Sequence, residues 1–259
     1  MLSNKIVSSS LLSLLVGIFV VGMAFPTASA QALTCQVSPD AVAINLMYNG
    51  TTLNVTGDSN AGDDLIVKVS SETGEVHLKY KGKASGFLWM KMGNMAFKNV
   101  PNVYMLNSTG PINALLDASG RTANMIGYDA IQAGSEMERS DGAEVESKWF
   151  AEFLKFKKAE ELYNVKEGAI VRENGKFSIA VEWPFQAPPA TYTVDVFAVR
   201  DGKVVDHASA PFTVAQAGIV KQLSGLAFNN SAIYGLLAVV IAMVAGFAVG
   251  AVFKGGGSH

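Results

Sequence analysis

An uncharged apolar stretch near the carboxyl end constrains this chain most strongly. From Tyr234 to Phe253 the sequence runs for 20 residues without a charged side chain, and Lys254 then ends the stretch. As an α-helix it would be about 30 Å long, because each residue adds about 1.5 Å, and that length matches the hydrocarbon core of a bilayer. The sequence therefore predicts a transmembrane helix over residues 234–253 and a short tail over residues 254–259.

A second apolar segment, residues 11–21, lies near the amino end and follows Lys5. It is short for a membrane span, and the small residues 28–30 come directly before Gln31. This order is typical of a secretory signal peptide, so we expect residues 1–30 to be removed by cleavage between Ala30 and Gln31. An uncleaved anchor is the alternative.

Export of the amino side sets the expected topology. The following domain would lie in the periplasm of a bacterial cell, held at the inner membrane by one helix. The carboxyl terminus would then lie in the cytoplasm, where Lys254 agrees with the tendency of basic residues to stay inside.

The charge of the chain excludes a nucleic-acid binder. The 20 Lys and Arg residues are balanced by 22 Asp and Glu residues, and no basic run is present. The expected exported domain, residues 31–218, keeps 17 of the basic and all 22 acidic residues, which gives a net charge of −5. This mildly acidic surface predicts no adhesion to anionic lipid by charge.

Residues 31–218 show the period-two alternation of β-strands. Seven short strands are expected in the first half, with Asn49-Gly50 and Thr73-Gly74 as turns. They lie near residues 42–47, 51–56, 65–69, 76–80, 87–92, 95–97 and 103–106. Their spacing favours an immunoglobulin-like sandwich.

A helical insertion is expected at about residues 111–165, with helices over 111–118 and 144–163. The glycine-containing stretch from Gly120 to Gly142 between them is expected to be a flexible loop. Clean alternation returns in residues 177–183 and 192–196, and Asp201-Gly202 marks a hairpin turn. The predicted fold class is therefore mainly β: one sandwich with a helical insertion, plus one carboxy-terminal transmembrane helix.

Four segments together resemble a known family. They are residues 86–89, residues 95–104, residues 189–196 with 200–202, and residues 234–238, in this order along the chain. The chain is similar in these segments to the alphaproteobacterial transmembrane protein family (Alph_Pro_TM). The resemblance implies a signal peptide, an exported β-rich domain and one carboxy-terminal span. Some relatives accompany sulfite-exporter-like permeases, and the family has no established catalytic residues that could be carried over to this chain.

Candidate reactive and metal-binding groups are few. Cys35 is the one cysteine, and it is either a reactive thiol or, by preference, a packed residue of the first strand. Four methionines invite a copper site, but adaptable core filling beside Phe87, Trp89 and Phe97 is the favoured interpretation. They are Met90, Met92, Met95 and Met105. The sequence shows no recognisable grouping of a nucleophile, a general base and a residue that orients the base. We therefore expect that the protein is not an enzyme and that it binds no cofactor and no metal.

Small residues recur every four positions along the predicted span, at Ala238, Ala242, Gly246 and Gly250. Such a face lets a second helix approach closely, although it can also arise by chance in a span rich in Ala and Gly. In residues 219–233 just before it, one helical face carries Ile219, Val220, Leu223, Leu226 and Ala227. This segment is expected to form a short helix at the membrane interface.

Two function classes follow from these features. The preferred hypothesis is a non-enzymatic accessory or assembly subunit that packs its helix on an integral membrane partner, such as a permease or redox complex, or on itself. The alternative is a tethered periplasmic module that binds a small ligand, a metal or an envelope component, which would need a concave site with converging polar groups.

Overall fold

The computed structural model describes residues 32–84, 87–142 and 148–254. The predicted signal peptide and its cleavage site at Ala30 and Gln31 lie outside the described residues, as does the tail after Lys254. The described chain is mainly β-strand and ends in one long apolar helix. The predicted fold class is therefore confirmed.

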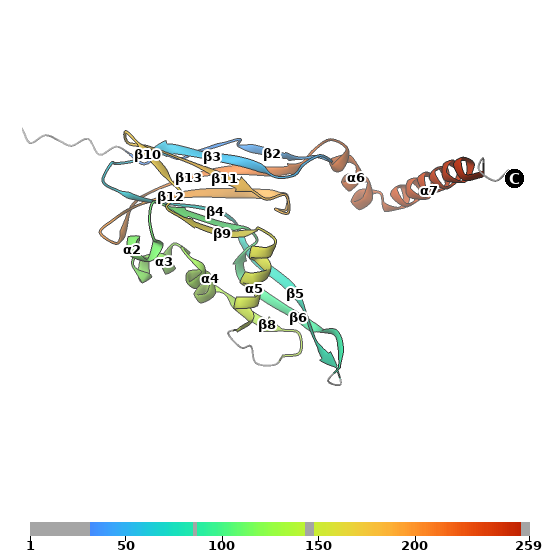
Figure 1. Cartoon of the computed structure of the whole chain (residues 1–259), viewed down its shortest axis with the longest axis horizontal. Helices are drawn as coiled ribbons and strands as arrows, with labels where there is room; N and C mark the ends of the chain where they lie inside the picture. Colours follow the sequence, from blue (N-terminus) through green and yellow to red (C-terminus); the bar gives the residue numbers. More distant parts are fainter. Residues whose placement is uncertain (1–31, 85–86, 143–147, 255–259) are drawn as a thin grey trace, which may run out of the picture. The chain divides into compact units, whose positions relative to one another are not determined.

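Two sheets pack face to face in the main domain (Figure 1). The first has the order β1 (Gln36–Ser38), β3 (Thr51–Asp58), β11 (Lys176–Trp183) and β10 (Val171–Glu173). The second has the order β2 (Ala41–Ile44), β13 (Lys203–Gln216), β12 (Ala190–Arg200), β4 (Asp64–Ser71), β7 (Tyr104–Ser108) and β9 (Tyr163–Glu167). The β2–β13 and β7–β9 pairs are parallel. The orders β1-β3-β11-β10 and β13-β12-β4 match strands A-B-E-D and G-F-C of an immunoglobulin-type sandwich.

Alternation along the strands builds the core between these sheets. In β11 every second residue, from Phe177 to Trp183, is buried, and the residues between them are exposed. The Trp183 ring lies 4.6 Å from the ring of Tyr192 in β12 and 5.0 Å from that of Phe212 in β13, measured between centroids. These edge-to-face contacts join the two sheets at one end of the sandwich.

Helices cover the outer face of the second sheet around β4 and β7 (Figure 1). They are α2 (Ile112–Leu115), α3 (Ala118–Ala123), α4 (Tyr128–Gly134) and α5 (Lys148–Ala159). This cover explains why all five residues of β7 are buried. The Tyr104 hydroxyl of β7 donates to the Met125 carbonyl and accepts from the Gly127 N–H, which fixes the link between α3 and α4.

The expected loop between Gly120 and Gly142 is wrong, because α3, α4 and β8 (Glu136–Arg139) occupy most of it. Asp117 caps α3 by accepting a hydrogen bond from the Gly120 N–H at 2.6 Å. Short capped helices with small residues lack the long apolar stripe by which sequence patterns reveal a helix.

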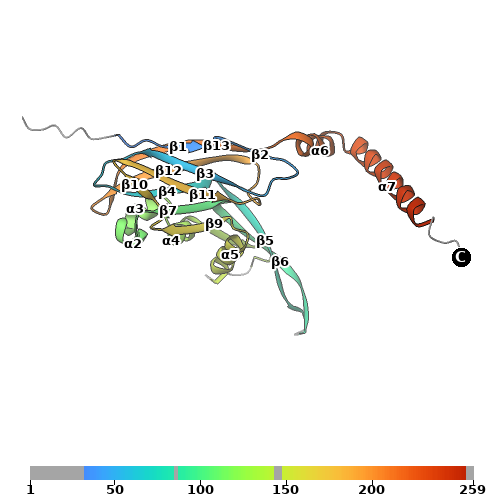
Figure 2. The same cartoon turned by 45° about the horizontal axis from the view of Figure 1, so that its top comes forward.

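A third sheet, in the order β5-β6-β8, extends from the sandwich (Figure 2). Strands β5 (Thr73–Ala84) and β6 (Leu88–Pro101) form one long hairpin. The expected turn at Thr73-Gly74 is therefore wrong, because both residues pair with β6. The two strands expected at residues 87–92 and 95–97 are likewise one strand.

Two helices follow the last strand, α6 (Gly218–Asn229) and α7 (Ser231–Lys254). They are separated at Asn230, whose N–H still bonds the Leu226 carbonyl at 2.9 Å.

Candidate functional site

Helix α7 is apolar on every side. Residues Ser231–Ala251 form a stretch of 21 residues that is long and apolar enough to cross a membrane, and none of it is buried against the rest of the described chain. Large side chains such as Leu236, Ile241 and Phe253 are all exposed, in three different directions around the helix. In water this surface would be strongly unfavourable, and a bilayer removes that cost.

The predicted small-residue face lies on this helix. Ala238, Ala242, Gly246 and Gly250 follow one another at four-residue intervals, which keeps them on one side of an α-helix. A Cβ atom added to Gly246 or Gly250 would meet no atom within 4 Å. Among the described residues nothing fills this shallow face, so a second helix has room to approach it.

Helix α6 carries apolar side chains that the domain does not cover. Ile219, Leu223 and Phe228 are exposed, whereas Leu226 and Ala227 are partly buried. The amphipathic pattern of residues 219–227 is that of a helix lying at a membrane surface.

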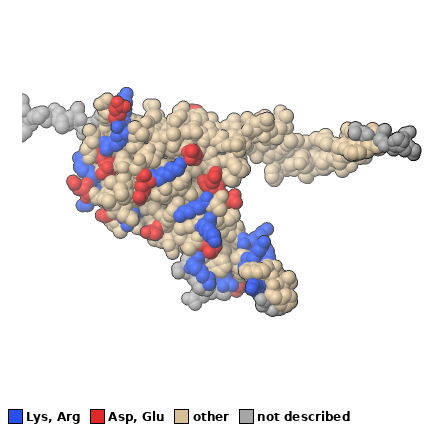
Figure 3. Space-filling model, in the orientation of Figure 1, with Lys and Arg blue, Asp and Glu red and all other residues tan. Residues whose placement is uncertain are grey.

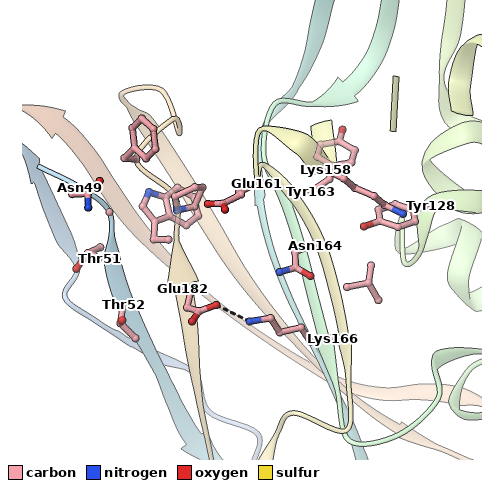
Figure 4. Close-up of a pocket in the computed structure, with 15 residues that line it drawn as sticks. Asn49, Thr51, Thr52, Tyr128, Lys158, Glu161, Tyr163, Asn164, Lys166 and Glu182 are labelled. Carbon is pink, nitrogen blue, oxygen red and sulfur yellow. Dashed lines mark hydrogen bonds and ion pairs between the residues drawn. The ribbon is translucent and has the colours of Figure 1, made fainter. Parts of the chain in front are cut away.

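A polar cleft of about 920 Å³ lies in the main domain (Figure 4). One wall comes from the start of β3 and the end of β11, and the other comes from β9 with the residues that follow α5. Lys166 of β9 crosses the cleft and pairs with Glu182 of β11, with 2.8 Å between Nζ and Oε2. This hydrogen bond is the main cause that lowers the pKa of Glu182, and the Lys166 charge adds to it. Further lining side chains include Asn49, Thr51, Thr52, Tyr128, Lys158, Glu161 and Asn164.

A buried lysine joins α5 to the base of the β5–β6 hairpin. Lys157 is 3% exposed, and its Nζ donates to the Asn102 carbonyl at 2.9 Å. The same Nζ lies over the rings of Phe153 and Tyr163, at 5.8 and 5.7 Å from their centroids. Burial lowers the pKa of Lys157 to about 8, and the charge of Glu160 opposes that shift. These contacts hold the hairpin base in place.

Cys35 lies just before β1 and is partly buried against the core. Its Sγ lies 3.9 Å from the Val194 carbonyl oxygen. Burial, and then the charge of Asp195, raises the pKa of the thiol to about 11, so little of the reactive thiolate exists near neutral pH. The position agrees with a packed residue better than with a reactive one.

The four methionines divide into two pairs. Met95 and Met105 are buried in the core, as core filling requires. Met90 and Met92 are exposed near the hairpin tip, together with Phe87 and Trp89, so the prediction that these four residues fill the core is wrong. Within the described residues no group of three His, Cys, Asp or Glu side chains has the geometry of a metal site.

Sequence reasoning missed the cleft and the exposed tip. The cleft combines residues from strands more than 100 positions apart, which no local pattern reveals. For the tip the sequence does contain a signal that could have been used, because residues 76–98 contain five lysines and no acidic residue.

Comparison with known proteins identifies the family of the chain. No curated protein and no solved structure matches it. Residues 32–255 match a family whose description is "Putative transmembrane protein (Alph_Pro_TM)", and this range includes the β-rich domain, α6 and α7. The chain therefore belongs to the Alph_Pro_TM family of transmembrane proteins, with a β-rich domain and one candidate membrane span at its carboxyl end.

Proposed function

We propose that this protein is a non-enzymatic accessory subunit that packs α7 against a helix of an integral membrane partner. The partner is a permease, a redox complex or another integral protein, or a second copy of the chain. The β-rich domain lies in the periplasm, and Lys254 faces the cytoplasm.

The observation that carries this proposal is the open small-residue face of α7. Lipid chains are as apolar as a leucine side chain, so helices associate in a bilayer through close packing rather than through the hydrophobic effect. The clear space above Gly246 and Gly250 supports such packing, because two backbones can come into direct contact there.

Enlarging this face tests the proposal. Gly246→Leu with Gly250→Leu should separate the two helices and remove packing worth roughly 1–2 kcal/mol per contact. The partner, or the second copy, should then no longer purify with the chain in mild detergent. The melting temperature of the domain should stay unchanged, because its core lies between the two sheets.

A matched control is available on the opposite side of the same helix. Ala248 and Ala251 are exposed and lie about 180° from the centre of the small-residue face, at about 100° per residue. Ala248→Leu with Ala251→Leu adds the same bulk but should leave the association intact. If the complex survives the glycine substitutions, or both pairs weaken it equally, α7 is only an anchor.

The polar cleft favours a second candidate, a tethered module that binds a small polar ligand. Its volume of about 920 Å³ and its converging Lys, Glu, Asn and Thr side chains meet the requirement for a concave site. Native mass spectrometry of the full chain should then detect a bound small molecule. Lys166→Gln with Glu182→Gln should release it, whereas exposed Lys155→Gln should not. Recovery of the chain without any ligand from its native membrane counts against this candidate.

A further inference from the structure

The β5–β6 hairpin extends beyond the elements that support it. Strand β8 pairs with β6 only at residues 95–98, and Ser140 adds a last bond to the Asn94 N–H. Beyond this point the two strands pair only with each other, up to Ala84 and Leu88. At about 3.3 Å per residue, the unsupported part is roughly 20 Å long. Figures 1 and 2 show it projecting from the domain.

Large apolar side chains at the end of this hairpin are open to solvent. Phe87 is 80% exposed, Trp89 is 64% exposed and Met92 is 49% exposed. Further back on the same strand Met95 and Phe97 are each 1% exposed and belong to the hydrophobic core, where Phe97 stacks on Phe153 of α5. A concentrated group of exposed large apolar side chains marks a contact surface.

Lysines surround this tip. Residues 76–98 contain Lys79, Lys81, Lys83, Lys91 and Lys98 and no acidic residue. Lys98 pairs with Glu138, but the other four form no ion pair with any residue that the structure describes. Figure 3 shows the blue lysines beside the tan end of the hairpin. The acidic average of the domain therefore hides a local cationic patch.

The strand register places these lysines next to the aromatic side chain of the tip. Lys83 lies opposite Trp89, and Lys81 lies opposite Lys91, so the four side chains share one face of the hairpin. The Lys83 Nζ lies 5.6 Å from the centre of the Trp89 ring. Tryptophan beside lysine is the combination typical of the headgroup layer of a membrane, where the ring enters the apolar boundary and the ammonium meets phosphate.

The hairpin and the membrane helices leave the second sheet from the same end. Ser71, the last residue of β4 before the hairpin, pairs with Tyr192, and Tyr192 also pairs with Phe212 of β13. From Phe212, β13 continues to Gln216 and into α6. The chain therefore leaves the same end of the second sheet both for the hairpin and for the helices that lead to the membrane.

We propose that the hairpin tip is a second membrane contact, which inserts Phe87, Leu88, Trp89 and Met90 into the surface of the bilayer that holds α7. The lysines around the tip bind the anionic headgroups of that surface. Two contact points fix the orientation of the domain over the membrane more firmly than one anchoring helix does. This contact does not require α7 to have a protein partner.

Trp89 is the reporter for the test. Of the other two tryptophans, Trp183 is buried in the sandwich and Trp149 is partly buried beside Tyr80. The full chain is placed in nanodiscs of phosphatidylcholine and phosphatidylglycerol, with plain or brominated acyl chains. Bromine quenches only tryptophan that enters the bilayer. Emission should fall in brominated discs, and Trp89→Ala should abolish the difference while leaving the melting temperature unchanged.

The lysines have a matched control. Lys81→Gln with Lys83→Gln should reduce the quenching at least twofold, as should discs of phosphatidylcholine alone. Lys176→Gln with Lys203→Gln removes two charges at the far end of the sheets and should leave the quenching unchanged.

Three results would overturn the proposal. Equal emission in plain and brominated discs, with Trp89 open to acrylamide, means that the tip is free in solution. Equal emission with Trp89 protected from acrylamide means that the rest of the chain, and not lipid, covers the tip. If the Lys81/Lys83 and Lys176/Lys203 variants lose quenching equally, the hairpin lysines have no specific role in the contact. Discs that hold a single chain keep the result independent of the helix-packing proposal.

Discussion

The buried charge of Lys157 should make the domain more stable as the pH rises from neutral to mildly alkaline. Its Nζ is enclosed by the Phe153 and Tyr163 rings, and burial lowers its pKa from 10.5 to about 8. In the unfolded chain the lysine keeps its ordinary pKa, so between the two values the unfolded state binds more protons than the folded state. Stability therefore rises with pH across this interval, and the gain is complete above the unfolded pKa.

The size of the effect follows from the same two pKa values. A difference of one pKa unit corresponds to about 1.4 kcal/mol, and from pH 7 to pH 9.5 the gain for this lysine is about 2 kcal/mol. Above pH 10 the tyrosines oppose it. Burial raises the pKa of Tyr128 and Tyr192 to about 12, so their contribution is present below the ordinary tyrosine pKa and is lost as the pH rises through 12.

Denaturant unfolding of the full chain in mild detergent measures this slope when it is followed by tryptophan emission, to which the buried Trp183 contributes. Lys157→Met removes the titrating group and keeps most of the side-chain volume, so the gain of about 2 kcal/mol between pH 7 and pH 9.5 should disappear. Lys155→Met, on the exposed side of the same helix, should retain it. A wild-type stability that is flat or falls over this interval, or equal slopes in wild type and Lys157→Met, would refute the reasoning.

Three further results are expected. Cys35→Ser should cost about 1 kcal/mol of stability, and the wild-type thiol should react with an alkylating reagent about tenfold faster per pH unit up to its pKa of about 11; a thiol already fast at pH 7 would contradict the burial argument. Trp183→Ala should destabilise the domain by about 3–5 kcal/mol in thermal or denaturant unfolding, because it opens a cavity between Tyr192 and Phe212; a loss below 1 kcal/mol would mean that the two sheets do not meet there. The mature protein should begin at Gln31 by amino-terminal sequencing, and detection of Met1 would show an uncleaved anchor.

Much of the sandwich could be predicted from the sequence, because its strands carry their own signals. Residues 177–183 alternate between buried and exposed positions, and Asp201-Gly202 connects β12 and β13 as expected. The segment from Gly120 to Gly142 could not be predicted in this way. Its short helices are stabilised by the Asp117 cap and by the Tyr104 hydroxyl, and the second of these contacts comes from a distant strand.

The sequence by itself determined the membrane helix, since 20 consecutive uncharged residues contain all the information needed to favour lipid over water. Only the tertiary structure decided which residues of strand β6 are buried, because Met90 and Met95 differ little in their local sequence. Met95 is buried because distant elements cover it, and Met90 is exposed because β8 and α5 end before they reach it. Burial depends on what lies across the strand from elsewhere in the chain, so the exposed tip and the polar cleft appear only when the chain is folded.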